Sequence, residues 1–280
     1  MPYSSPFCIT ADDFGMDPGL DEGILEGIAA GGIGNVSIWT HTPNLTDLPE
    51  RTLDLLSRVC IGLHWNLFPL TMDINRPGEA IEAIRSAFPD TKSLEKARLV
   101  WNFAFEALER QGLHPAFING HQHVHLFPGW VKPVCQWAVS NGMRCMRRPR
   151  ELGTGGFIAK MRRPALLVLE ILGTLSARIG RRFPLTWIPA LCRWGRAFTF
   201  DEVLADFEGQ PGSTTGNAIE LMTHPGRPTS AYLCETRSPS DHLGQLAQVC
   251  RSDLHDLLAR HGFASARLDG NPLVHYRKIP

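Results

Sequence analysis

Three histidines, His121, His123 and His125, alternate within five positions directly after the apolar run at 115–118. The whole chain has eleven histidines in 280 residues, so this grouping is dense. Imidazoles at alternate positions beyond a strand-like segment direct several nitrogens toward one point, which is how proteins assemble a metal site. A loop of surface histidines is the other interpretation of such a stretch.

Other polar residues that could bind a metal also stand where apolar runs end. Asp12 and Asp13 follow the run at 7–11, His64 follows 60–63, and His224 follows 218–223. Taken singly, the aspartates could cap a helix, and a lone histidine is more often a satisfied interior residue. Taken together they suggest one site, because the carboxyl ends of the strands of a (β/α) barrel share one face.

The hydrophobic pattern predicts alternating strands and helices. Strands are expected at 7–13, 35–41, 60–67, 115–118, 143–151, 218–224 and within 263–274, and helices at 20–30, 45–59, 94–111, 130–141 and 241–261. Residues 69–92 are expected to form a long loop or lid. This alternation is typical of a parallel sheet. We therefore expect an α/β protein with a TIM-barrel-like (β/α) barrel, built as a single domain over 1–280.

Composition excludes several classes of protein. Apolar residues make up 43% and charged residues 20%, as in a soluble globular chain with an ample core. The seven cysteines are scattered without a Cys-x-x-Cys pair, which favours reduced, buried thiols and a cytoplasmic location. We expect neither a signal peptide nor a membrane-spanning segment.

A basic block contrasts with the overall net charge of zero. Residues 144–196 contain eleven Arg and one Lys against two Glu, a net charge of +10. The apolar stretch 164–175 lies inside this block. One interpretation is a buried helix followed by a loop. The other is a basic, aromatic insertion at about 153–200 that rests on an anionic membrane or grips a lipid-linked substrate.

The candidate ligands favour hydrolytic chemistry. One carboxylate with two imidazoles leaves coordination positions open, as in catalytic metal sites. A second carboxylate could act as the base on a water molecule, and a histidine opposite could protonate a departing amine. Such a site suits amide hydrolysis. The chain has neither a Gly-rich nucleotide loop nor a Gly-x-Ser-x-Gly elbow.

Four motifs, in order, resemble the YdjC-like carbohydrate deacetylases. They are Thr-Ala-Asp-Asp-Phe-Gly, Gly-Leu-His-Trp-Asn-Leu, Gly-His-Gln-His-Val-His and Thr-His-Pro-Gly. The family includes chitooligosaccharide deacetylases and hopanoid-associated, HpnK-like deacetylases. The resemblance implies a TIM-barrel-like fold and metal-dependent removal of an N-acetyl group from an amino sugar, often by a homodimer.

The resemblance also implies roles for individual residues. Asp12 would be the base and His224 the acid, and one divalent metal ion, Zn²⁺ or Mg²⁺, would be bound by Asp13, His64 and His121. His123 and His125 would orient ligands or substrate, and Arg147 would contact the sugar. One departure stands out. Many relatives have Asp-Ser before the His-x-His, whereas this chain has Asn119-Gly120, which keeps the shape of the side chain but removes its charge.

The basic block bears on the choice of substrate. It favours an HpnK-like branch acting on N-acetylglucosamine carried by a lipid such as a hopanoid, with the protein peripheral at the inner membrane. A chitooligosaccharide deacetylase, another metal-dependent amidohydrolase or deformylase, and a non-catalytic lipid-binding or metal-binding module are the alternatives. No nucleic-acid partner is expected, because the arginine spacing matches no recognition motif.

Overall fold

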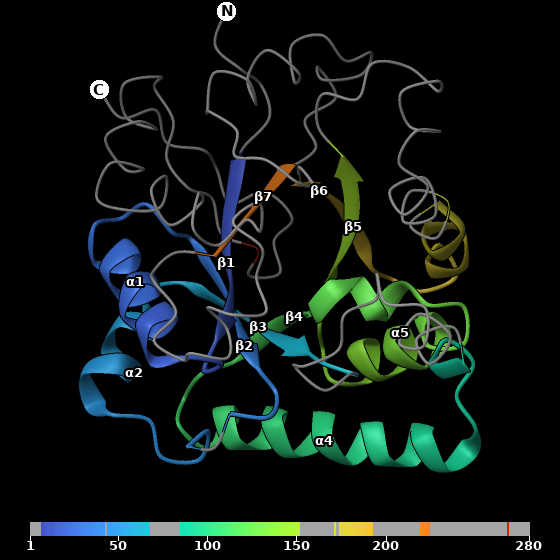
Figure 1. Cartoon of the computed structure of the whole chain (residues 1–280), viewed down its shortest axis with the longest axis horizontal. Helices are drawn as coiled ribbons and strands as arrows, with labels where there is room; N and C mark the ends of the chain where they lie inside the picture. The colour runs from blue at the N-terminus through green and yellow to red at the C-terminus, as the bar shows by residue number, and fades with distance from the viewer. Residues whose placement is uncertain are drawn as a thin grey trace, which may run out of the picture.

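A closed barrel of parallel strands forms the centre of the computed structural model, which describes residues 7–42, 44–67, 85–151, 171, 174–192, 219–224 and 268. The barrel order follows the chain, and the last strand in this described part pairs with the first (Figure 1). The strands are β1 (Phe7–Phe14), β2 (Asn35–Trp39), β3 (Cys60–Trp65), β4 (Pro115–Gly120), β5 (Cys145–Glu151), β6 (Thr186–Cys192) and β7 (Ile219–Thr223). The expected α/β, TIM-barrel-like architecture is confirmed.

Helices surround the barrel (Figure 1). They are α1 (Pro18–Ala29), α2 (Glu50–Ser57), α4 (Thr91–Glu109) and α5 (Val131–Ser140), with a 3₁₀ segment, η1 (His121–Leu126). Local sequence explains where two of them begin. The Asp17 carboxylate accepts a hydrogen bond from Gly19 N at 2.9 Å at the start of α1, and Asp90 accepts one from Ser93 N at 2.8 Å at the start of α4.

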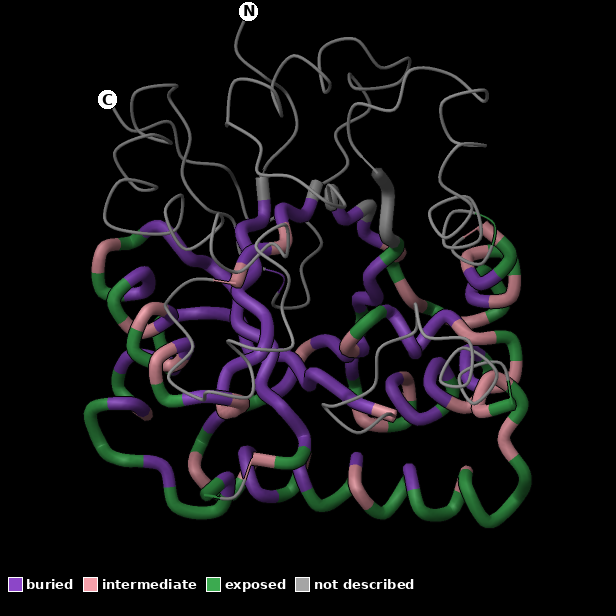
Figure 2. The backbone as a smooth tube through the Cα atoms, viewed as in Figure 1, coloured by how far each residue is buried: buried purple, intermediate pink, exposed green. Residues whose placement is uncertain are grey.

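Strand residues alternate between two apolar environments. Outward residues of the strands, among them Ile9, Val36 and Leu63, are buried against the helices in the main core. A second, smaller cluster fills the amino-terminal end of the barrel interior and comprises Cys8, Cys60, Phe117, Cys145, Ile188 and Leu268. Figure 2 shows the buried strands in purple inside half-exposed helices. The polar residues of the site occupy inward positions above this second cluster.

Tryptophans join α4 and α5 to the sheet. The ring of Trp65 on β3 lies 5.0 Å from that of Trp101 on α4 and 4.8 Å from that of Trp130, which precedes α5. All three side chains are buried. These contacts fix the helices that flank β4, and therefore the strand that leads into the histidine-rich stretch.

Most expected elements in the described part of the chain are present, and one strand was not expected. Residues 186–192, within the expected insertion at 153–200, form β6 and complete the barrel between β5 and β7. Of the expected loop or lid at 69–92, residues 69–84 lie outside the described residues, and Thr91 already begins α4. Of the apolar stretch at 164–175, residues 164–170, 172 and 173 lie outside them as well. The expected helix at 241–261 and, apart from Leu268, the expected strand within 263–274 are also outside the described residues.

Two further findings concern the cysteines and the length of the helices in the described part. The thiols of Cys8, Cys60, Cys135 and Cys145 are free and buried, in agreement with a reduced set. No helix within the described ranges has the length and apolar character needed to cross a membrane.

Candidate metal centre

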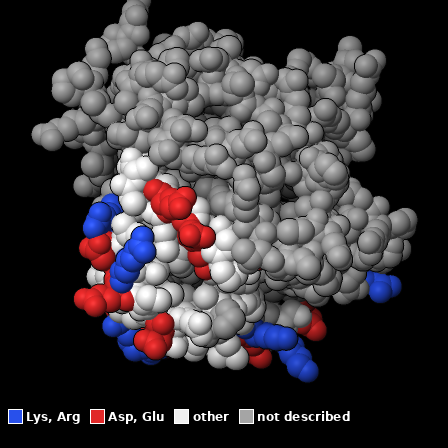
Figure 3. Space-filling model, turned by 60° about the vertical axis from the view of Figure 1, so that its left-hand side comes forward, with Lys and Arg blue, Asp and Glu red and all other residues white. Residues whose placement is uncertain are grey.

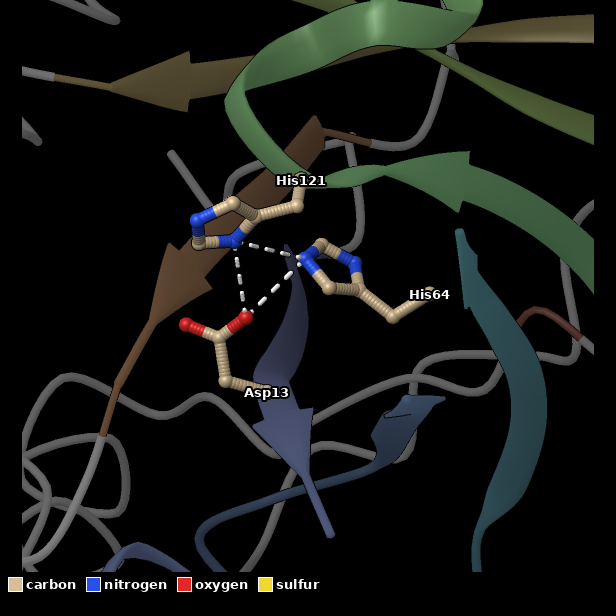
Figure 4. Close-up of side chains that lie close together, drawn as sticks. All are labelled: Asp13, His64 and His121. Atoms are coloured by element: carbon tan, nitrogen blue, oxygen red, sulfur yellow. Dashed lines mark hydrogen bonds and ion pairs between the residues drawn. The ribbon is translucent and has the colours of Figure 1, made fainter. Parts of the chain in front are cut away.

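Three side chains from three strand ends converge at the carboxyl end of the barrel (Figure 4). Asp13 Oδ1 lies 3.1 Å from His64 Nε2 and 3.0 Å from His121 Nδ1, and the two imidazole nitrogens are 3.4 Å apart. Asp13 and His64 are buried, and the His121 side chain is 17% exposed. The expected convergence of Asp13, His64 and His121 is therefore found in the structure.

A bulge in β1 brings the two neighbouring aspartates to the same site. The register between β1 and β2 shifts between Ala11 and Phe14, and Asp13 has a positive φ of 68°. In a regular strand, successive side chains point to opposite faces. The bulge instead lets Asp12 and Asp13 both reach the barrel interior, which is a common use of bulges near active sites.

The triangle of Asp13, His64 and His121 fits a divalent metal ion. Its edges match those between donor atoms that each lie about 2.0–2.2 Å from one ion. With both rings neutral and their lone pairs turned inward, three acceptors would face one another and require a cation. One carboxylate and two imidazoles suit Zn²⁺ and related ions, and Mg²⁺ where water completes the coordination.

Asp12 lies on the other side of the His64 ring in a dense set of hydrogen-bond donors. Both of its oxygens accept hydrogen bonds from the Arg147 guanidinium, and the Ser37 hydroxyl donates to Oδ1. Burial opposes ionisation of Asp12, but Arg147 and His64 outweigh it, so the pKa lies well below its usual value. Asp12 is thus held as a carboxylate.

A buried glutamate completes this arrangement. Glu220 on β7 accepts from Arg147 Nε at 3.0 Å and from Nη2 at 2.6 Å. Both side chains are 2% exposed. The Arg147 guanidinium is therefore shared between Asp12 and Glu220 inside the barrel. Its expected contact with a sugar stays a prediction.

His224, expected as the acid, lies beside the metal triangle at the end of β7. Its Nε2 is 3.7 Å from Asp13 Oδ2, the oxygen that does not face His64 and His121. The side chain is 16% exposed. Among the described residues in contact with the buried carboxylate of Asp13, His121 and His224 are partly exposed.

The alternating histidines do not all face the same point. Beyond Gly120 the chain turns into η1, where Gln122 and His123 have positive φ values of 49° and 61°, so only His121 joins the triangle. Burial lowers the pKa of His125 to about 3 and that of His123 well below its usual value, so both rings are neutral. His125 Nε2 donates to the Arg147 carbonyl at 3.1 Å. The expectation that the alternating histidines face one point was wrong, because the strand ends at Gly120. The role expected of His123 and His125, to orient ligands or substrate, stays a prediction.

Three residues near the site were not singled out from the sequence. Ser37 contacts Asp12, Glu220 pairs with Arg147, and the Trp39 ring lies edge to face with His121 at 5.0 Å. Two signals could have indicated them. Ser37 and Trp39 stand at alternate positions near the end of an expected strand, and Glu220 interrupts an apolar run, which demands a buried partner.

The chain is similar to known proteins over most of its length. A family model described as YdjC-like protein matches residues 7–260. A carbohydrate deacetylase of Mus musculus is 30% identical over 251 residues, covering 79% of this chain and 78% of the relative. One of Homo sapiens is 28% identical and covers 79% and 75%.

A solved structure is similar in fold. It is a crystal structure from Enterococcus faecalis, provisionally described as a cellobiose-phosphate cleavage protein. The TM-score is 0.56 at 14% identity, and the match covers 96% of this chain and 99% of the other. At this identity the likeness concerns the fold alone.

Proposed function

Because the chain belongs to the YdjC-like family, we propose that it is a carbohydrate deacetylase, a metal-dependent hydrolase that removes the N-acetyl group of an amino sugar. The observation that carries this proposal is the convergence of Asp13, His64 and His121 beside the buried carboxylate of Asp12. The names of the mouse and human relatives support the same activity.

In this proposal Asp13, His64 and His121 hold one divalent ion, either Zn²⁺ or Mg²⁺. Such an ion, when bound, polarises the amide carbonyl and lowers the pKa of a neighbouring water to about 7 in the zinc case. Asp12 accepts the proton of the attacking water. The hydrogen-bond donors around Asp12 keep this carboxylate ionised and also make it a weak base. Asp12 can therefore take a proton only from a water whose pKa has been lowered.

His224 completes the proposed reaction as the acid. Its partly exposed ring lies beside Asp13, on the side where the substrate would approach, and it would give a proton to the departing amine. The Arg147 guanidinium keeps Asp12 charged and in place. The backbone carbonyl of Arg147 accepts a hydrogen bond from His125. Water attack, carbon–nitrogen cleavage and protonation of the amine together release acetate and a free amino sugar.

We further propose that the amino sugar is carried by a lipid, such as a hopanoid, and that the protein works peripherally at the anionic inner face of a membrane, as a homodimer. Support for the membrane surface comes from a stripe of four exposed residues, Ile171, Leu175, Arg178 and Arg182, of which Leu175 and Arg178 lie in the helical segment 174–180. The apolar pair is 49% and 46% exposed, and both arginines are exposed.

The opposite side of this helical segment is anchored to the protein. Ser176 Oγ donates to the Leu126 carbonyl at 2.9 Å, and Gly180 packs under the Trp187 ring. Exposed apolar side chains beside arginines therefore project outward, which suits an anionic lipid surface. In the part of the surface that Figure 3 colours, by contrast, basic and acidic side chains are interspersed.

The test is acetate release from N-acetylglucosamine carried on a lipid and, separately, from chitooligosaccharides. Wild type would be compared with Asp12→Asn and His224→Ala. Release from the lipid form alone supports both the deacetylase activity and the lipid-linked substrate. Release from oligosaccharides keeps the activity and removes the lipid-linked substrate. Release from neither substrate, by protein that binds metal, would point to another amidohydrolase or a deformylase.

A further inference from the structure

Asn119 on β4 lies between a proposed metal ligand and the buried carboxylate behind it. Its Oδ1 is 2.6 Å from His64 Nδ1, and its Nδ2 is 3.3 Å from Asp12 Oδ1 and 3.3 Å from Ser37 Oγ. The side chain is fully buried. The sheet register pairs Asn119 with His64, so the contact follows from the barrel itself.

The charge of Asp12 determines which way the amide faces. An ionised carboxylate can only accept hydrogen bonds, so the NH₂ group of Asn119 must face Asp12. The carbonyl oxygen of the same amide then faces His64. Because that oxygen can only accept, a neutral His64 must carry its proton on Nδ1. The lone pair is then on Nε2, the atom that faces Asp13 and His121.

We propose that Asn119 is a positioning residue that fixes His64 in the tautomer able to bind a metal ion. It transmits the charge state of Asp12 to the metal triangle without touching the ion. Asp12 does not do this directly, since its Oδ1 is 4.0 Å from His64 Nδ1. Ser37 Oγ, at 3.3 Å from that nitrogen, is a weaker partner than the amide oxygen at 2.6 Å.

A neutral amide also limits the charge of the site. Three buried carboxylates, Asp12, Asp13 and Glu220, belong to this site, and Arg147 is the only buried permanent cation among the described residues. A fourth carboxylate at position 119 would stand against Asp12. Asparagine supplies the oxygen that His64 needs and donates toward Asp12 at the same time, which an ionised aspartate cannot do.

The proposal rests on the metal site of the proposed function, and its first test needs neither metal nor substrate. Nitrogen-detected NMR on metal-free protein with labelled histidine distinguishes the two neutral tautomers, at a pH where the His64 ring is neutral. Assignment uses His64→Gln. Wild type is expected to carry the proton on Nδ1. A proton on Nε2 overturns the proposal and leaves the deacetylase assay unaffected as the test of function.

Variants at position 119 then distinguish a role of Asn119 in orienting His64 from a general effect on folding. Asn119→Leu removes the acceptor and is expected to mix the tautomers and weaken Zn²⁺ binding 10- to 100-fold in a chelator competition. Asn119→Asp keeps an oxygen opposite His64 and is expected to retain the tautomer and to bind Zn²⁺ within about threefold of wild type or more tightly. Asn102→Leu is the matched control, because Asn102 accepts from Trp137 Nε1 on the outer helices.

The outcomes are separable even if Asn119→Leu folds poorly. Cooperative unfolding of each variant is checked first, and if Asn119→Leu fails, wild type and Asn119→Asp decide the question through the NMR spectrum. Unchanged tautomer and unchanged Zn²⁺ affinity in folded Asn119→Leu would overturn the proposal. A loss of affinity in Asn119→Asp as large as in Asn119→Leu would overturn it as well.

Discussion

Arg147 on β5 and Glu220 on β7 form a two-bond ion pair inside the barrel, with Nε–Oε2 at 3.0 Å and Nη2–Oε1 at 2.6 Å. The strands are not neighbours, because β6 lies between them. The pair therefore bridges two strands across β6, on the inner side of the barrel. Asp12 is bound by the remaining nitrogen, Nη1, and also by Nη2, which donates to both carboxylates.

Removal of the Arg147 charge should destabilise the protein strongly. Arg147→Met leaves Asp12 and Glu220 buried without their shared cation, and breaking such a buried pair costs about 3–5 kcal/mol. Urea unfolding measures this loss. Arg148→Met is the control, since the neighbouring Arg148 is exposed and bonds only Thr174 among the described side chains at 3.2 Å. Equal effects of the two changes would contradict the assigned role.

Asp21 should make stability depend on pH. Burial, with Asp17 nearby, raises the pKa of Asp21 to about 6, although its Oδ1 accepts from Gly15 N at 2.6 Å. Between pH about 4 and 6 the folded state holds a proton that the unfolded state has released, so this group lowers stability as pH rises through that window.

Asp21→Asn keeps the acceptor for Gly15 N and removes the ionisable group. Since Asp21 is partly exposed, we expect a gain of about 1 kcal/mol at pH 7.5 that disappears at pH 4, measured by urea unfolding at both values. The control is Asp54→Asn, on an exposed side chain of α2. A gain of the same size at both pH values would contradict the titration of Asp21.

The sequence predicted the alternation and most strand ends, because strand hydrophobicity and helix periodicity are local properties. It did not reveal β6, since Thr-Trp-Ile-Pro-Ala-Leu-Cys has a proline in its interior and lies inside a basic block. Their place at strand ends singled out Asp12, Asp13, His64, His121 and His224 as candidates, and the family resemblance implied which three of them would bind the metal ion.

The partners of those residues depend on register, which the sequence does not give. Asn119 faces His64 because β3 and β4 are aligned with these residues side by side. Glu220 meets Arg147 from the next strand but one, 73 positions further along the chain. The turn into η1, with two consecutive residues at positive φ, likewise could not be read from His-Gln-His-Val-His.

Gly62 should be required by the packing of the barrel interior. A Cβ at this position would lie 2.2 Å from Phe117 Cε2, so Gly62→Ala should cost about 1–3 kcal/mol by overpacking. Phe117→Leu removes the obstructing ring atoms, and the double variant should recover part of that cost. A double-mutant cycle by urea unfolding measures the coupling. If the losses in unfolding free energy of the two single variants simply add up in the double variant, the contact between position 62 and Phe117 is contradicted.

The arginines of the outward stripe should govern membrane binding. Arg178→Glu with Arg182→Glu should reduce co-sedimentation with vesicles containing anionic lipid at least tenfold, because two attractive charges become repulsive. Arg98→Glu with Arg110→Glu, both exposed on or beside α4, is the control of equal charge. If wild type does not bind these vesicles, or if both double variants bind equally, the membrane proposal fails.

The most direct test of the central claim is acetate release measured against metal occupancy. Chelated protein would be titrated with Zn²⁺ or Mg²⁺ in the presence of an N-acetylated amino sugar, with His64→Ala and Asp13→Asn alongside. The rate should rise with bound metal, reach its plateau at one ion per chain, and be lost in both variants at concentrations that saturate wild type. Full acetate release by metal-free protein, or full release by either variant, would contradict a metal-dependent deacetylase centred on these residues.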